Sequence, residues 1–146
     1  FDRVYSINVK SIFNMAHAVV PLMRKAGGGV ILNVGSVAGI RPRPGLTWYN
    51  GSKGAVNLLS KSMAVELGSH GIRVNAICPV IGETGMLQQF MGQPDTPENR
   101  AKFIATIPLG RLSRPSDVAA VAHFLATDAA EFISGVEFPV DGARTV

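Results

Sequence analysis

The chain has 146 residues, 47% of them hydrophobic and 16% charged, which is the size and composition of one small globular domain and not of a disordered segment. Its formal charge of +4 comes from scattered lysines and arginines without interleaved aromatic side chains, so we expect no nucleic-acid partner. No apolar run reaches the roughly 18 to 20 residues that cross a bilayer, and no basic-then-apolar leader is seen, so we expect a soluble cytoplasmic protein without a membrane partner.

The first half of the chain alternates helix, strand and helix. Apolar residues recur at helical spacing over residues 1–24, and the three glycines at 27–29 end this pattern. The β-branched run at 30–34 is typical of a strand that is buried in a parallel sheet. A loop rich in proline occupies 40–47, and a second helix is predicted over 49–67.

The second half continues this alternation. A strand is predicted over 72–78, and the turn-rich stretch 80–106 predicts two small helices. A further helix is expected over 115–127, and a last strand over 136–141. Strands that alternate with long helices indicate right-handed β-α-β units and therefore an α/β fold with a parallel sheet. A sheet of only three strands leaves an apolar edge that another segment or subunit must cover.

Tyr49, Lys53 and Ser36 carry the most informative pattern in the chain. Tyr49 and Lys53 stand four residues apart at the start of the second helix, and Ser36 follows the first strand. A phenol has an unperturbed pKa of about 10, but a lysine one helical turn away favours the phenolate. With a serine hydroxyl nearby, the set suits a carbonyl that is reduced or an alcohol that is oxidised.

These residues belong to longer runs with a familiar order. The runs are Asn33–Gly39, Tyr49–Ala55 and Arg73–Pro79, together with Asn8-Val9 near the start and Val140–Gly142 near the end. Five segments in this order resemble the short-chain dehydrogenase/reductase family, and the resemblance covers the whole chain. It implies the C-terminal portion of a Rossmann-like, doubly wound parallel sheet, with three strands and flanking helices in this chain.

The resemblance also implies roles for four residues. Tyr49 would be the general acid/base, and Ser36 would orient the substrate oxygen. Lys53 would lower the pKa of Tyr49 and bind the nicotinamide ribose. Asn8 would hold a water molecule that links Lys53 to solvent. All four positions are filled in this chain.

The loop after the second strand matches the family only in part. Members of the family carry a glycine after the proline and a threonine four residues further on, and these residues lie against the nicotinamide. Here Val80 takes the place of that glycine and Gly82 stands where a branched residue is usual, whereas Thr84 matches. The cofactor-binding residues that the resemblance implies are Tyr49, Lys53, Pro79, Gly82 and Thr84.

One family motif has no counterpart in this sequence. Members of the family bind the pyrophosphate with a glycine-rich turn of the form T-G-x-x-x-G-x-G, whose glycines admit phosphate close to a helix N-terminus. No such turn occurs here, and neither does the later residue that selects between the two cofactors. We therefore expect residues 1–146 to be a partial domain that lacks the N-terminal phosphate-binding part, about 100 residues, with either NAD or NADP as cofactor.

Several residues allow a plain structural interpretation beside the functional one. Tyr49 and Lys53 can be an aromatic helix start with a solvated neighbour, and Asn8 can be exposed or bonded locally. Thr84 can be the N-cap of a helix around residues 86–91 as well as a cofactor contact. Arg41 and Arg43 can be ordinary surface, or can meet an anionic substrate or an acidic carrier protein.

An apolar set in the turn-rich stretch is interpreted as a movable lid over a hydrophobic substrate or as packing of two small helices. It comprises Met86, Leu87, Phe90, Met91, Phe103 and Ile104. The three histidines lack metal-ligand spacing with each other or with Cys78, the only cysteine, so we assign no metal. Cys78 itself is interpreted as a small core residue.

Two hypotheses of different classes follow from these patterns. The first is an NAD(P)-dependent oxidoreductase acting on a small-molecule ketone or secondary alcohol, with a 3-oxoacyl thioester as the first substrate guess and a sugar or polyol as the alternative. The second is a catalytically inactive fragment that acts only in assembly. The helices at 1–24 and 49–67 are the usual subunit contacts in the family, so a homotetramer or homodimer is expected.

Overall fold

Three parallel strands form one sheet in the computed structural model, which describes residues 1–146. The strands are, in chain and in spatial order, β1 (Gly29–Val34), β2 (Ile72–Pro79) and β3 (Glu137–Val140). Ile77 in the central strand lies between Val34 and Phe138 of its neighbours. The predicted three-stranded parallel sheet is therefore confirmed, and β1 and β3 form its two edges.

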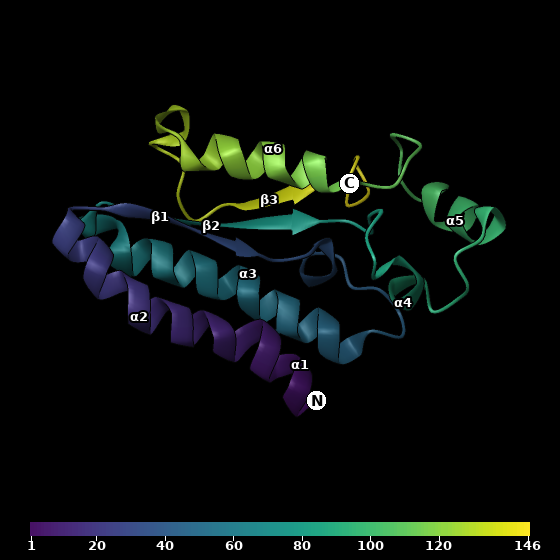
Figure 1. The fold of residues 1–146 in the computed structure, drawn as a ribbon, viewed down its shortest axis with the longest axis horizontal. Helices are drawn as coiled ribbons and strands as arrows, with labels where there is room; N and C mark the ends of the chain where they lie inside the picture. Colours follow the sequence, from purple (N-terminus) through teal and green to yellow (C-terminus); the bar gives the residue numbers. More distant parts are fainter.

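Helices cover both faces of the sheet (Figure 1). One face carries α1 (Asp2–Tyr5), α2 (Ser11–Ala26) and α3 (Thr47–Leu67), and the other carries α6 (Pro115–Ala126). Between α1 and α2 the backbone makes one π-helical turn, η1 (Ser6–Lys10). The helix predicted over 1–24 is thus one rod with a widened turn in its first half, and flanking helices on both faces are confirmed.

Two apolar layers hold these helices to the sheet. Ile72 and Val74 point to the α3 face, where they pack against Ala64 and Leu67. Ile77 points to the opposite face and packs against Leu125 of α6. This alternation follows from the two-residue period of a strand, and β2 is buried because it is covered on both faces.

The stretch 80–106 contains the two predicted small helices, α4 (Leu87–Met91) and α5 (Pro97–Ile104). They lie beyond the carboxyl ends of the strands, away from the main layers (Figure 1). Their contacts form a separate small core of four buried residues, Leu87, Met91, Ile107 and Leu112. The second interpretation of the apolar set, packing of two small helices, therefore applies to Leu87 and Met91.

Candidate active site

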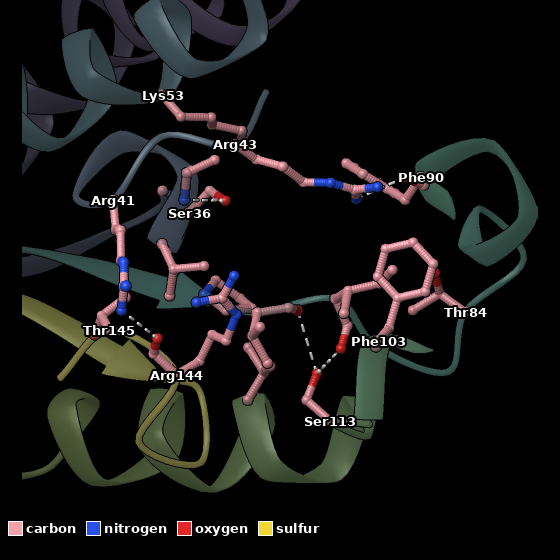
Figure 2. A pocket seen from close by; sticks show the side chains of 18 of the residues that line it. Ser36, Arg41, Arg43, Lys53, Thr84, Phe90, Phe103, Ser113, Arg144 and Thr145 are labelled. Atoms are coloured by element: carbon pink, nitrogen blue, oxygen red, sulfur yellow. Dashed lines mark hydrogen bonds between the residues drawn. The ribbon is translucent and has the colours of Figure 1, made fainter. Parts of the chain in front are cut away.

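A cavity of about 580 Å³ opens at the carboxyl ends of β1 and β2, where ligands bind in open α/β sheets. Its wall is formed by the turn after β1, the start of α3, the loop after β2 and the segment of α4 and α5 (Figure 2). Six of the seven predicted site residues line it, namely Ser36, Tyr49, Lys53, Pro79, Gly82 and Thr84. The seventh, Asn8, does not line it.

Ser36 sits directly after the carboxyl end of β1 and is 7% exposed. Its Oγ accepts a hydrogen bond of 3.1 Å from the backbone N–H of Ala38 and so caps the short 3₁₀ turn Val37–Gly39. This bond uses only an acceptor site, so the hydroxyl proton can be donated to the Tyr49 oxygen or to a ligand oxygen.

Tyr49 lies in the first turn of α3, and its ring packs edge-on against Phe90, with 5.5 Å between centroids. Burial raises the pKa of Tyr49 above its ordinary value, and a side-chain hydrogen bond with Ser36 lowers it in part. The phenol therefore carries its proton near neutral pH, which is the form that can donate to a carbonyl oxygen.

Lys53 lies one turn after Tyr49 in α3, and its ammonium is 5.8 Å from the centroid of the Tyr49 ring. Its Nζ donates a hydrogen bond of 2.8 Å to the carbonyl of Val34 at the end of β1. Burial lowers the pKa of Lys53, an effect that the nearby Cys78 thiol opposes. That Lys53 lowers the pKa of Tyr49 stays a prediction, because its ammonium here contacts a main-chain carbonyl.

Asn8 is in the π turn η1 and contacts α3 at Ser52. Its Nδ2 donates to Ser52 Oγ at 2.9 Å, and Ser52 Oγ donates to the carbonyl of Tyr49 at 2.8 Å. Asn8 and Lys53 also line a second cavity of about 430 Å³. Asn8 is thus neither locally bonded nor simply exposed, and its water-binding role stays a prediction.

The loop after β2 places Pro79, Gly82 and Thr84 on the cavity wall. Gly82 pairs with Ser113, and a Cβ at this glycine would come within 2.5 Å of Ser113 Oγ. The close approach of the two segments therefore favours a residue without a side chain at position 82. Thr84 Oγ1 accepts from the N–H of Met86 at 3.3 Å. Met86, not Thr84, is the N-cap of α4, so the capping expectation for Thr84 is wrong: its hydroxyl closes the preceding turn.

The structure adds residues that the sequence patterns did not assign to the site. Ser52 is fully buried and links Asn8 to Tyr49; its place three residues after Tyr49 in a helix was the available signal. Phe90 and Phe103 line the cavity; the sequence placed them in the apolar set interpreted as a lid or as packing of two small helices, without assigning them to the site. Arg144 lines it as well, and no sequence signal links it to Ser36 or Tyr49.

No group of three or more His, Cys, Asp or Glu side chains lies close enough to hold a metal ion. None of the helices combines the length and the apolar character that crossing a bilayer requires. The polar side chains that line the cavity carry hydroxyl, ammonium and guanidinium groups.

Comparison with known proteins gives consistent matches. A family model described as enoyl-(acyl carrier protein) reductase matches residues 1–144. The 4-formylbenzenesulfonate dehydrogenase of Comamonas testosteroni is 51% identical over 146 residues, which are 100% of this chain and 58% of that protein.

Solved structures agree with this match. The 3-ketoacyl-(acyl-carrier-protein) reductase of Brucella melitensis, complexed with NADH, superposes with a TM-score of 0.92 at 41% identity and covers 100% of this chain and 58% of its own. The gluconate 5-dehydrogenase of Burkholderia cenocepacia, in complex with NADP and tartrate, gives a TM-score of 0.89 at 32% identity, covering 97% and 54%. The chain therefore spans a little over half the length of these proteins.

Proposed function

The chain belongs to the short-chain dehydrogenase/reductase family, and on that premise we propose that it forms the catalytic part of an NAD(P)-dependent oxidoreductase. The reaction is hydride transfer between nicotinamide and a ketone or secondary alcohol. The observation that supports this proposal most is the convergence of Ser36, after β1, with Tyr49 and Lys53, at the start of α3, on one cavity.

We assign the proton chemistry to these side chains. In the reducing direction the Tyr49 hydroxyl donates its proton to the carbonyl oxygen, while the Ser36 hydroxyl holds that oxygen by a hydrogen bond. In the oxidising direction Tyr49 accepts the alcohol proton. Lys53 favours the phenolate that forms, and Asn8 positions the start of α3 through Ser52.

The donor set on the cavity wall fits the nicotinamide end of a dinucleotide. The Lys53 ammonium and the Tyr49 and Thr84 hydroxyls are the groups that would hold the ribose and the amide. A bound cofactor would supply or accept the hydride at the substrate carbon. Relatives are complexed with NADH in one case and NADP in another, so either cofactor fits this proposal.

We also propose that residues 1–146 are a partial dinucleotide-binding domain. The sequence carries no glycine-rich phosphate turn, and the chain covers 58% and 54% of two structures that contain a cofactor. The alternative, an inactive assembly module, predicts no cofactor binding by the 146 residues alone. Titration of this chain with NADH and NADPH separates the two, because micromolar binding would contradict the module.

The substrate proposal is a 3-oxoacyl thioester, with a sugar or polyol as the alternative. The Brucella relative is named for a 3-ketoacyl-carrier substrate, the Burkholderia relative for gluconate and the Comamonas relative for an aromatic sulfonate. Relative turnover of acyl thioesters, free sugars and aromatic carbonyls by the complete protein decides among them. A preference for sugars over thioesters would overturn the first proposal.

Replacement of Tyr49 by phenylalanine in the complete protein tests the proposed function. The variant keeps the ring that packs against Phe90 but loses the hydroxyl, so turnover should fall by about a hundredfold or more while thermal stability is retained. Steady-state turnover and a thermal melt measure the two effects. Near-normal turnover by Tyr49→Phe would overturn the assignment.

A homo-oligomer in the cytoplasm is part of the same proposal. The helices α2 and α3 expose large apolar side chains, including Phe13, Leu22, Leu58 and Val65, and such a surface favours burial against another subunit. Light scattering of the complete protein and of Leu58→Glu tests it. A monomer at micromolar concentration would argue against the expected dimer or tetramer.

A further inference from the structure

The cavity that holds Tyr49 has a one-sided charge. Six basic residues line it and no carboxylate does: Arg41, Arg43, Lys53, Lys102, Arg114 and Arg144. Positive groups gathered without an anion repel one another, and a cavity focuses their field on whatever enters it. A negatively charged ligand group would relieve this repulsion.

Five of the six have no acidic partner within the protein, and two of these five, Lys53 and Lys102, donate to uncharged oxygens. Arg114 forms an ion pair with Glu83 at 3.6 Å, and Lys102 donates to Asn99 at 3.0 Å. The other three are Arg41, Arg43 and Arg144, and none of the five ion pairs of the chain includes them. These three arginines are called the arginine cluster below.

Arg43 is half-buried, and its guanidinium is fixed on two sides. One nitrogen donates to the carbonyl of Phe90 at 2.8 Å, and the guanidinium carbon lies 4.7 Å from the centroid of the Phe103 ring. Burial, and the charge of Arg144, lower the pKa of Arg43. The remaining N–H groups of this guanidinium are available to a ligand.

Arg144 is held by the turn that follows β3. The Asp141 carboxylate accepts hydrogen bonds from the N–H groups of Ala143 and Thr145 and from the Thr145 hydroxyl. Arg41 donates to the main-chain carbonyl of Arg144 at 3.3 Å, which ties the loop after β1 to this turn (Figure 2). The cluster therefore joins two segments that are far apart in the sequence, since Arg41 and Arg144 are separated by 103 positions.

We propose that the substrate carries, besides its reacting carbonyl or alcohol, an oxyanion such as a carboxylate or sulfonate that binds between Arg43 and Arg144. This rests on the proposed function for the reacting group, and it favours an anionic ketone or alcohol over the 3-oxoacyl thioester, whose acyl group carries no oxyanion. Guanidinium groups match planar and tetrahedral oxyanions through paired N–H donors. Phe90 touches both Tyr49 and Arg43, so a short apolar spacer separates the anion from the reacting carbon.

The direction of the arginines favours a small molecule over an acidic protein. Arg43 is held on the cavity wall against Phe90 and Phe103, and this fixes its guanidinium toward the cavity. Figure 2 shows Arg43 and Arg144 both extending into the space that Ser36 and Lys53 also line. An acidic carrier would instead meet arginines that are directed outward.

The test compares ligands that differ only in charge. Isothermal titration of the complete protein uses 4-acetylbenzoate against 4-acetylbenzamide, and 3-oxobutanoate against 3-oxobutanamide, so that both an aromatic and an aliphatic spacer are sampled. At least one anion should bind about ten- to a hundredfold tighter than its amide, as expected for charge-assisted hydrogen bonds to a carboxylate. A further arm with 4-acetylbenzenesulfonate distinguishes carboxylate from sulfonate recognition.

Two variants locate the effect, and a third controls for net charge. Arg43→Gln and Arg144→Gln should each remove most of the preference for the anion, whereas Arg24→Gln, at the far end of α2, should leave it intact. Equal binding of anion and amide in both pairs, or no binding of either, overturns the proposal. So does a loss of NADH or NADPH affinity in the cluster variants without any change in ketone binding.

Turnover of the same ligands separates this proposal from the proposed function. If an anion binds through Arg43 and Arg144 but no ketone is reduced, the oxidoreductase assignment fails and the anion site stands. If ketones are reduced without preference for the anion, the oxidoreductase assignment stands and the anion site fails. Dependence on Arg41 that appears only with carrier-linked substrates also overturns the proposal, because it assigns the cluster to a protein surface.

Discussion

The two walls of the cavity differ in how they are held. Tyr49 and Lys53 lie on α3, which packs against the central strand β2, and Ser36 follows β1, which pairs with β2. Phe90 and Phe103, on the other wall, belong to α4 and α5, whose core is separate from that of the sheet. The proton chemistry thus rests on the part of the molecule that is packed on the sheet, and the Phe90 and Phe103 contacts rest on a part with its own small core.

The connections between the walls support this distinction. On the sheet side, Gly39 lies so close to α3 that an added Cβ would come within 2.7 Å of the Gly54 nitrogen. On the other side, the small core of α4 and α5 meets the remaining chain near the bridge between Gly82 and Ser113. Variants on the sheet side should therefore alter stability or catalysis, and variants on the α4–α5 side should alter substrate affinity.

The largest expected effect is on the sheet side, from Ile72→Ala. Ile72 is 1% exposed at the start of β2 and packs against Ala64 and Leu67. Its truncation should lower the free energy of unfolding by about 2 to 5 kcal/mol, because a cavity replaces the lost contacts. Urea denaturation of the complete protein measures the loss. Turnover per folded molecule should stay unchanged. A large drop in this turnover would contradict the proposed difference between the two walls.

The next effect should appear in catalysis. In Gly39→Ala the new methyl group would push the Ser36 turn away from Lys53 and Gly54 of α3, so kcat should fall about ten- to a hundredfold through misplacement of the reacting groups. Gly54→Ala is the matched control, since its Cβ would meet only the Gly39 carbonyl at 3.8 Å. Equal kcat in both variants would show that the contact does not position Ser36.

A smaller and local effect is expected from Leu87→Ala in α4. Leu87 is 3% exposed in the small core. Its loss should raise KM for the substrate and speed amide hydrogen exchange in α4 by at least about tenfold, because this core opens without unfolding the sheet. Exchange measured by mass spectrometry checks this. Equal acceleration in β2 would show that the two cores unfold together.

The smallest effect concerns pH and the start of α6. Asp117 accepts hydrogen bonds from the Arg111 guanidinium and from the N–H of Arg114, and these bonds lower its pKa to about 2. A carboxyl whose folded pKa is depressed stabilises the fold above its ordinary pKa of about 4, and this contribution is lost as the pH falls toward 2.

The comparison variant Asp117→Asn should therefore melt below the parent at pH 7 and approach it near pH 2. Thermal melts across this range measure the difference. A difference in melting temperature that stays constant with pH would show that the charge of Asp117 does not cause the stabilisation. The exposed position of the pair keeps the expected effect small.

The sequence predicted the features that depend on local periodicity, which are the strands and the long helices. The three strands and the approach of Ser36 to Tyr49 follow from apolar runs and from the rule that parallel strands end at one edge. The position of Arg144 could not be predicted, because it depends on where β3 pairs and on the turn that Asp141 closes. The glycine at 82 is explained only by its contact with Ser113.

The π turn η1 has a consequence for every residue before it. Such a turn accommodates one additional residue, and one residue corresponds to a rotation of about 100° around a helix axis. The Tyr5 hydroxyl lies over Gly51 of α3, and Asn8 reaches Ser52 from within η1. A deletion in this turn would swing Tyr5 away from α3 while the later part of the helix stays in place. Changes of length here therefore act as rotations of one contact surface against another.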